Sequence, residues 1–366
     1  MLITTEAVRT PSVERLLYLW AQRYKPDIST LPLAGDYSEY NLLLQTVSVE
    51  GRAITAAKLK DSLLDSNCQM AWIQAKSLYA YIPNILDLQE ARRITQFAFR
   101  VYKKILEIYQ QRPLNKVVDS YPAIGSNFQN NSLSAWGLPA IDQLAYALEP
   151  VLLVFQEQHV TSKDWRAMGF MTSQLNFSNK LILRKVTPIE RVLLKPYLKF
   201  VEEQVAIPWH RVCSAAAKYE LDSPEFILVE QMLPLADEIA QCIYNRLSEL
   251  LPDYRCQRGK LSDPEVRHSS TRDLNMFQAY LWLCILKRDV APIEQELLNL
   301  CVMVMESVHV PWELTEKWLQ VLTEELLIRC TPEQQQILLP YTQVMKQVFI
   351  EQRHRLGFRD STVAAI

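Results

Sequence analysis

The residues best able to bind a charged ligand stand together near the middle of the C-terminal half. Arg272 and Asp273 are adjacent in the chain. A guanidinium binds a carboxylate through two hydrogen bonds, and a carboxylate withdrawn from water needs several donors. Such a pair is therefore suited to a ligand that carries both carboxylates and N–H groups. Further contacts to ligand carboxylates are expected from the preceding segment, through Arg267, Arg258 and Lys260.

The pattern around this pair predicts a helix over about 270–288. Ser270 and Asp273 have the spacing of a capping box, and apolar residues then recur at intervals of three and four. These apolar residues are Leu274, Phe277, Leu281 and Cys284. A purely structural role for the same residues is the alternative, in which Ser270 and Asp273 cap the helix and Arg272 pairs with a nearby acid. A second amphipathic helix is expected over 292–308.

The whole stretch resembles the central helices of the phycobiliproteins, the globin-like antenna proteins of cyanobacteria and red algae. In that family a bilin-bearing cysteine, one further residue and Arg-Asp precede a Tyr-rich apolar helix, a Gly-Asp turn and a helix that ends near Val-Pro. The pattern matches Arg272-Asp273, Tyr280, Asp289 and Val310-Pro311 here. The bilin cysteine falls on Ser270, which cannot form the thioether. The resemblance covers roughly the C-terminal half of the chain.

The resemblance implies that Arg272 pairs with a bilin propionate and that Asp273 accepts hydrogen bonds from the pyrrole N–H groups. Arg267 and Tyr280 complete the expected site. Because the attachment cysteine is replaced, we expect no covalently attached cofactor. The leading hypothesis is a non-catalytic adaptor, assembly or regulatory factor that binds phycobilisome or photosystem subunits through a phycobiliprotein-like surface.

Two alternatives belong to other classes. One is a sensor or carrier that holds a linear tetrapyrrole (a bilin) non-covalently at the same residues, although Met276, Phe277 and Trp282 compete for the space that a pigment needs. The other is an enzyme of bilin metabolism, such as a lyase or isomerase. The chain has no nucleophile motif, P-loop, Gly-rich dinucleotide turn or acid–base constellation to support an enzyme, so we expect none.

Composition and patterning predict an all-α protein. Only seven of the 366 residues are glycine, and few segments alternate apolar and polar residues as strands and hairpins do. We expect an N-terminal helical domain of unknown family over 1–185, a globin-like, phycobiliprotein-like domain over 186–352 and a flexible tail over 353–366. In phycobiliproteins an N-terminal helix pair mediates dimerisation, so the resemblance makes residues 188–219 a candidate homodimer interface.

The net charge, the cysteines and the histidines argue against several kinds of partner and site. A formal net charge of −2 argues against nucleic acid as a bulk partner, and no apolar run is long enough to span a membrane. The seven cysteines lack CxxC spacing and the five histidines are scattered, so neither disulfides nor a metal site is expected. The first residues lack the apolar core of a signal peptide. The expected location is the cytoplasm, with peripheral association at the thylakoid implied by the resemblance.

The N-terminal half contains further features, the first of which has two interpretations. A helix predicted over 88–111 has a basic outer face that is either solvated or a docking face for an acidic partner. Its members are Arg92, Arg93, Arg100, Lys103 and Lys104. Residues 114–136 have no period and predict a long loop. Helices are also expected over 54–64 and 68–81, and Thr161 with Asp164 has capping-box spacing before a helix through about Leu183.

Overall fold

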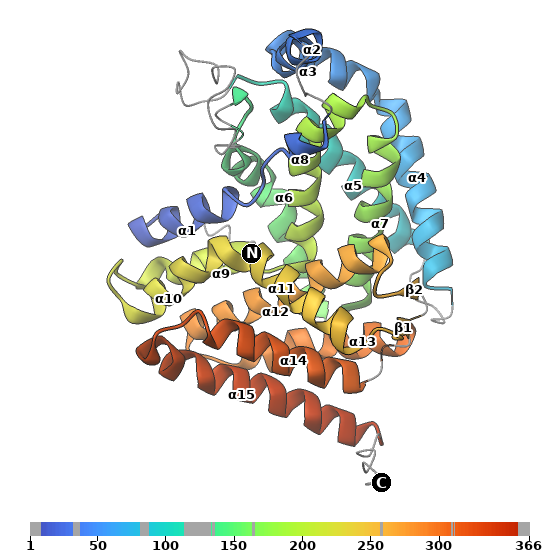
Figure 1. Cartoon of the computed structure of the whole chain (residues 1–366). Coiled ribbons are helices and arrows are strands. Elements are labelled where there is room, and N and C mark those ends of the chain that lie inside the picture. The colour runs from blue at the N-terminus through green and yellow to red at the C-terminus, as the bar shows by residue number, and fades with distance from the viewer. Residues whose placement is uncertain are drawn as a thin grey trace. The chain divides into compact units, whose positions relative to one another are not determined.

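The computed structural model of the chain is all-α, as the sequence predicts (Figure 1). It describes residues 9–31, 37–80, 88–112, 133, 136–162, 165–256, 259–308, 310 and 312–357. Within these ranges the strands are β1 (Arg255–Cys256) and β2 (Gly259–Lys260), which form one antiparallel hairpin. None of the described helices combines the length and the apolar character needed to cross a bilayer. Most of the predicted 114–136 loop and Arg258 lie outside the described residues.

The chain forms two compact units. We call Trp20–Ala206 the N-terminal unit, and Met1–Leu19 together with Ile207–Ile366 the C-terminal unit. The boundary therefore lies after Ala206 and not near residue 185 as predicted. Helix α8 (Pro188–Ala206) packs against α7, α6, α5 and α2 of the N-terminal unit, and most of its residues are buried. This burial also argues against the first part of 188–219 as a free dimerisation face.

The N-terminal unit is a helical bundle with a helical pair attached. Helices α4, α5, α6, α7 and α8 pack on one another, and the pair α2 and α3 contacts α8 and α5 (Figure 1). The bounds are η1 (Ile28–Thr30), α2 (Tyr37–Val47), α3 (Val49–Lys58), α4 (Asp61–Leu78), α5 (Leu88–Tyr109), α6 (Ile141–Ser162) and α7 (Trp165–Leu183). The basic outer face of α5 is exposed at Arg92, Arg93, Arg100 and Lys103, whereas Lys104 is half-buried. Ile94, Val101, Ile105 and Ile108 on the same helix are buried.

A buried arginine on α3 ties the parts of this unit together. The Arg52 side chain donates to the carbonyl oxygens of Tyr109 (2.7 Å), Gln111 (2.8 Å) and Gly137 (3.1 Å), and also to that of Val47. Tyr109 and Val47 are the last residues of α5 and α2, where helix carbonyls lack partners and carry partial negative charge. One guanidinium therefore satisfies the ends of two helices and the segment before α6. Burial lowers the pKa of Arg52, but an arginine remains protonated in proteins.

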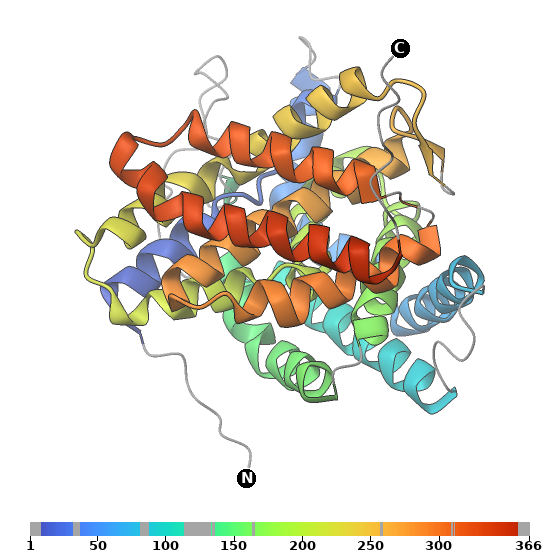
Figure 2. The same cartoon turned by 90° about the horizontal axis from the view of Figure 1, so that it is seen from below.

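The C-terminal unit is organised around α12 (Pro264–Lys287). Every side chain from Leu274 to Leu286 on this helix is buried, and α9, α10, α11, α15 and η5 pack around it. The C-terminal helices α14 and α15 run side by side (Figure 2). The other bounds are α9 (Trp209–Ala215), η3 (Ala216–Lys218), α10 (Pro224–Met232), η4 (Leu233–Leu235), α11 (Ala236–Leu250), η5 (Pro292–Leu297), α13 (Leu298–Val308), α14 (Trp312–Leu327) and α15 (Pro332–Arg355). Helix α1 (Pro11–Ala21) begins in this unit and ends in the other.

The end of α15 corrects the predicted flexible tail. The helix continues to Arg355, and Arg353 is buried. Its guanidinium pairs with Glu316 (2.7 Å) and Glu313 (3.0 Å) on α14. These ion pairs anchor the last turn, so the tail cannot begin at residue 353. At the start of the same helix, Thr331 and Gln334 form a complete capping box.

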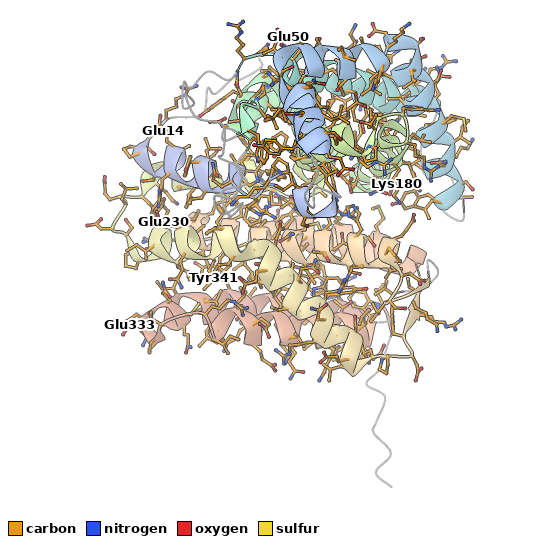
Figure 3. The ribbon with its side chains drawn as sticks, turned by 45° about the horizontal axis from the view of Figure 1, so that its top comes forward. Glu14, Glu50, Lys180, Glu230, Glu333 and Tyr341 are labelled. Carbon is orange, nitrogen blue, oxygen red and sulfur yellow. The ribbon has the colours of Figure 1, made fainter. Side chains whose placement is uncertain are left out.

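Two helix boundaries in the N-terminal unit differ from the prediction. The predicted helices over 54–64 and 68–81 are instead α3, which ends at Lys58, and α4, which runs unbroken from Asp61. Lys60 has an extended backbone, and its carbonyl accepts the first helical hydrogen bonds of α4. Thr161 lies within α6, and Asp164 lies outside the described residues. Charged side chains such as Glu50 and Glu333 lie on the outside of the helices (Figure 3).

We predict that Arg52→Met lowers the free energy of unfolding by about 3 kcal/mol, because two buried and two partly buried carbonyl groups lose their donor. Urea denaturation followed by far-ultraviolet circular dichroism measures this change. Arg92→Met on the exposed face of α5 is the matched control and should shift stability by less than about 0.5 kcal/mol. Equal stability of the two variants would show that the guanidinium does not hold the helix ends together.

Candidate functional site

The helix that carries the predicted binding residues begins earlier than expected. Helix α12 begins at Pro264, with Asp263 as its N-cap residue, and Arg267 donates its backbone N–H to the Asp263 carbonyl at 2.9 Å. Ser270 and Asp273 therefore lie inside the helix, and the predicted capping box at these positions is wrong. Proline is favoured in the first turn of a helix, so the Asp-Pro dipeptide at 263–264 is the stronger start signal.

Arg272 and Asp273 bind each other. The Arg272 Nη2 and Nε atoms donate to Asp273 Oδ1 at 2.8 and 3.1 Å, and both side chains are mostly shielded from solvent. This contact matches one part of the structural alternative, because Arg272 pairs with a nearby acid, but Asp273 does not cap the helix. The contact also leaves Asp273 bound to Arg272 and not directed at a ligand. One turn further along α12, Phe277 is buried and packs on Trp318 and Phe349 with ring centroids 5.9 and 5.6 Å away.

The other two predicted site residues face different neighbours. Arg267 donates to Asn245 Oδ1 at 2.7 Å and lies 5.2 Å from the ring centroid of Tyr244 on α11. Tyr280 is buried and its hydroxyl donates to Glu296 Oε2 at 3.4 Å. A helix rises about 1.5 Å per residue, so Arg267 and Tyr280 are separated by about 20 Å along α12. The structure places all four residues on one helix but does not bring them together.

Tyr280 belongs to a charged cluster that the sequence did not reveal. Arg211 on α9 forms a bidentate pair with Glu296, with Nη2 and Oε1 at 2.8 Å. Burial raises the pKa of Tyr280 and the charge of Glu296 raises it further, so the phenol stays protonated. Burial lowers the pKa of Arg211, but the hydrogen bond and the charge of Glu296 outweigh it and raise the pKa. Glu296 faces inward from the π-helical turn η5, which α-helical periodicity does not predict.

The buried thiols are not activated nucleophiles. Burial raises the pKa of Cys284 and of Cys68 to about 12 and that of Cys330 to about 11. These cysteines are therefore neutral thiols near pH 7, whereas a catalytic cysteine needs a depressed pKa. In the part of the chain that the structure describes, no three His, Cys, Asp or Glu side chains converge as a metal site. Its ionisable clusters act as structural ion pairs.

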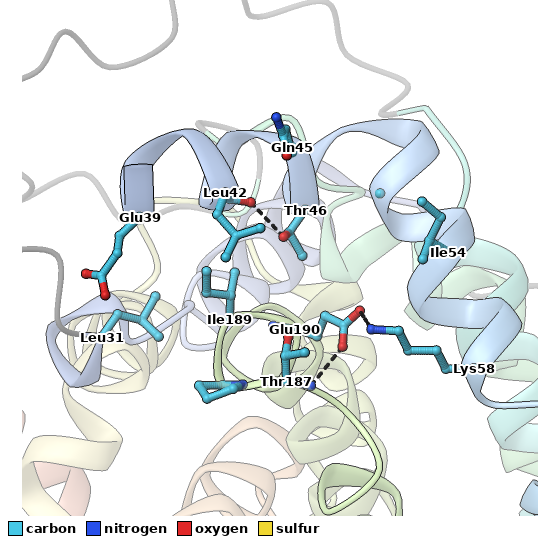
Figure 4. A pocket seen from close by; sticks show the side chains of 12 residues that line it. Leu31, Glu39, Leu42, Gln45, Thr46, Ile54, Lys58, Thr187, Ile189 and Glu190 are labelled. Carbon is cyan, nitrogen blue, oxygen red and sulfur yellow. Dashed lines mark hydrogen bonds and ion pairs between the residues drawn. The ribbon is translucent and has the colours of Figure 1, made fainter. Parts of the chain in front are cut away.

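The N-terminal unit contains an open groove of about 430 Å³ between the helical pair α2 and α3 and the start of α8 (Figure 4). Apolar atoms form most of its exposed surface, and Leu42 and Ile54 remain 52% and 61% exposed. The lining residues are Leu31, Glu39, Leu42, Gln45, Thr46, Gly51, Ile54, Lys58, Thr187, Pro188, Ile189 and Glu190. Concave apolar surface with a few fixed polar groups is typical of a binding site.

Gly51 allows the two helices of the upper wall to approach closely. A Cβ atom at this position would lie 2.0 Å from the Gln45 carbonyl oxygen and 2.8 Å from the Thr46 Cα. Only glycine fits between the end of α2 and the first turn of α3. Ser48 caps α3 by accepting the Gly51 backbone N–H at 3.0 Å. The shape of the groove wall is thus set by a close backbone contact.

Glu190 holds the lower wall against α3. Its Oε1 atom accepts hydrogen bonds from Lys58 Nζ at 2.6 Å and Thr55 Oγ1 at 3.0 Å, and its Oε2 accepts the Thr187 backbone N–H at 2.8 Å. Burial alone would raise the pKa of Glu190, but these donors outweigh burial and hold the pKa below its usual value. The carboxylate therefore stays ionised and fixes the position of α3 on α8.

Comparison of the chain with protein-family models, with curated proteins and with solved structures finds no match.

We predict that Glu190→Gln lowers stability near neutral pH by about 1–3 kcal/mol, because the Lys58 pair and a charge-assisted hydrogen bond are lost. The folded-state pKa of Glu190 is depressed, so its contribution is present above the ordinary value of 4.5 and is lost as pH falls through the folded-state pKa. Wild type and variant should therefore converge in urea midpoint on acidification. A difference that stays constant from neutral to acidic pH would exclude this linkage.

Proposed function

We propose that the chain is a non-catalytic helical adaptor that binds a helical segment of another protein in the groove of its N-terminal unit. The observation that carries this proposal is the exposed apolar lining of the groove at Leu42 and Ile54. Amphipathic helices bind such grooves by burying apolar side chains at helical spacing. The ion-paired and protonated state of the buried ionisable groups supports a role without catalysis.

The partners that we propose come from the phycobiliprotein-like pattern in the C-terminal half. They are subunits of the phycobilisome or of a photosystem, which the adaptor would bind during assembly or regulation. Such a role would place the protein in the cytoplasm at the thylakoid surface. The non-covalent bilin alternative requires Arg272 and Asp273 to face a pigment. Because the two side chains bind each other, the adaptor is the better supported function.

The groove is tested with a pair of matched double variants. We predict that Leu42→Asp with Ile54→Asp weakens binding to purified phycobilisomes or photosystems at least about tenfold, because charges enter the apolar lining. Co-sedimentation with each purified complex measures the binding. The control is Met70→Asp with Ile73→Asp on α4, whose side chains are 49% and 53% exposed and lie outside the groove. If neither complex binds the wild-type chain, the proposed partners are wrong.

We also predict that the chain purified from bilin-producing cells is colourless across the visible range. No thioether can form at Ser270, and the Arg272–Asp273 pair is closed. An absorbance spectrum before and after denaturation in acid urea makes the test. A visible band that extracts on denaturation, and that Asp273→Ala abolishes, would establish the non-covalent bilin carrier in place of the adaptor.

A further inference from the structure

The corner between α7 and α8, which borders the groove, has an unbalanced surface charge. Between Trp165 and Val201 the sequence has seven Lys or Arg residues and one acidic residue, Glu190. Glu190 is buried and its carboxylate is engaged by Lys58. The charged groups that remain at the surface of this corner are therefore basic. Those nearest the groove are Arg184, Lys185 and Arg191, all of which are exposed.

These three residues lie close in the chain to residues that line the groove. Arg184 and Lys185 lie in the turn after α7, two to three positions before Thr187, which lines the groove. Arg191 follows Glu190 in the first turn of α8, and its Nε donates to the Leu183 carbonyl at 3.1 Å. That bond fixes Arg191 across the end of α7. We call Arg184, Lys185 and Arg191 the basic rim.

One end of the groove carries an acidic side chain and the other end an ion pair. Figure 4 shows Glu39 beside Leu31 at one end, and Lys58 with Glu190 at the other. Because Lys58 is neutralised by Glu190, the excess positive charge near that end comes from the basic rim. A bound segment therefore meets apolar side chains along the groove and positive charge beside the start of α8.

We infer that the groove selects an amphipathic helical segment of a partner protein that carries acidic residues where it meets the basic rim. This inference deepens the proposed function and rests on it. Complementary charge at the edge of an apolar site raises the association rate and discriminates against partners of the wrong sign. Acidic side chains of the partner thus provide specificity, while its apolar side chains provide most of the affinity.

Other polyanions fit the observations less well. Nucleic acids bind through many phosphate contacts and offer no apolar face to the groove, and the net charge of the whole chain is −2. An anionic membrane is bound by apolar side chains that project from a convex face. Leu42 and Ile54 instead line a concave groove. A protein segment accounts for both the apolar lining and the basic rim.

The test uses two fluorescein-labelled amphipathic peptides with leucines at helical spacing, one with glutamates and one with lysines on the opposite face. Fluorescence anisotropy should show that the full-length chain binds the glutamate peptide at least about tenfold more tightly, with a preference that decreases as salt is added. Reversal of the basic rim, R184E with K185E and R191E, should abolish or invert the preference. The matched control reverses Arg92 and Arg100 on α5, as R92E with R100E, and should preserve it.

The outcomes separate this inference from the proposed function. Equal binding of both peptides, sensitive to L42D with I54D, would overturn the acidic-partner inference and leave the groove as a binding site. Failure of both peptides to bind would overturn the groove itself. Tighter binding of a DNA duplex or of phosphatidylglycerol vesicles, lost on reversal of the basic rim, would show that the rim serves a nucleic acid or a membrane and not a protein segment.

Discussion

The N-terminal unit depends on one buried cation, the guanidinium of Arg52, whose hydrogen bonds go to main-chain carbonyl groups and not to a carboxylate. Arg52 is surrounded instead by main-chain carbonyl oxygens at 2.7 to 3.1 Å. A buried charge is costly unless hydrogen bonds and opposing partial charges compensate it. The ends of α2 and α5 supply both, because their last carbonyls lack helical partners and the helix dipoles point their negative ends toward the guanidinium. The same bonds fix where the two helices end.

The groove follows from this arrangement. Arg52 holds the start of α3 against α5, and one turn later Thr55 and Lys58 hold the same helix against Glu190 on α8. Helix α3 is thus fixed on both sides by polar contacts, which leaves Ile54 directed outward. Gly51 then brings α2 close enough to complete the wall. The opening lies between helices that these polar bonds help to position.

The sequence predicted the class of fold and most helices, because helical periodicity and proline starts are local signals. The capping box at Thr331 and Gln334 is one example, since both partners lie within one turn. The sequence did not predict the groove, because Glu190 and Lys58 are 132 positions apart and no local pattern links them. The spacing of Thr187 and Glu190 is that of a capping box, and the two residues do form one. Nothing in the sequence indicates that the other oxygen of Glu190 binds α3. Similarly, the inward turn of Glu296 depends on a π-helical register that α-helical periodicity cannot anticipate.

The Arg-Asp pair shows why residue types alone do not define a site. Arg272 and Asp273 have the chemistry to bind a pigment, and the same chemistry lets them bind each other at 2.8 Å. Adjacent opposite charges on a partly buried helix need no ligand to be satisfied, so their presence carries little information about a partner. Exposed apolar side chains beside unbalanced charge carry more information, because no contact among the described residues of the N-terminal unit removes Leu42 and Ile54 from solvent. Folding satisfies the Arg272–Asp273 pair and leaves Leu42 and Ile54 exposed.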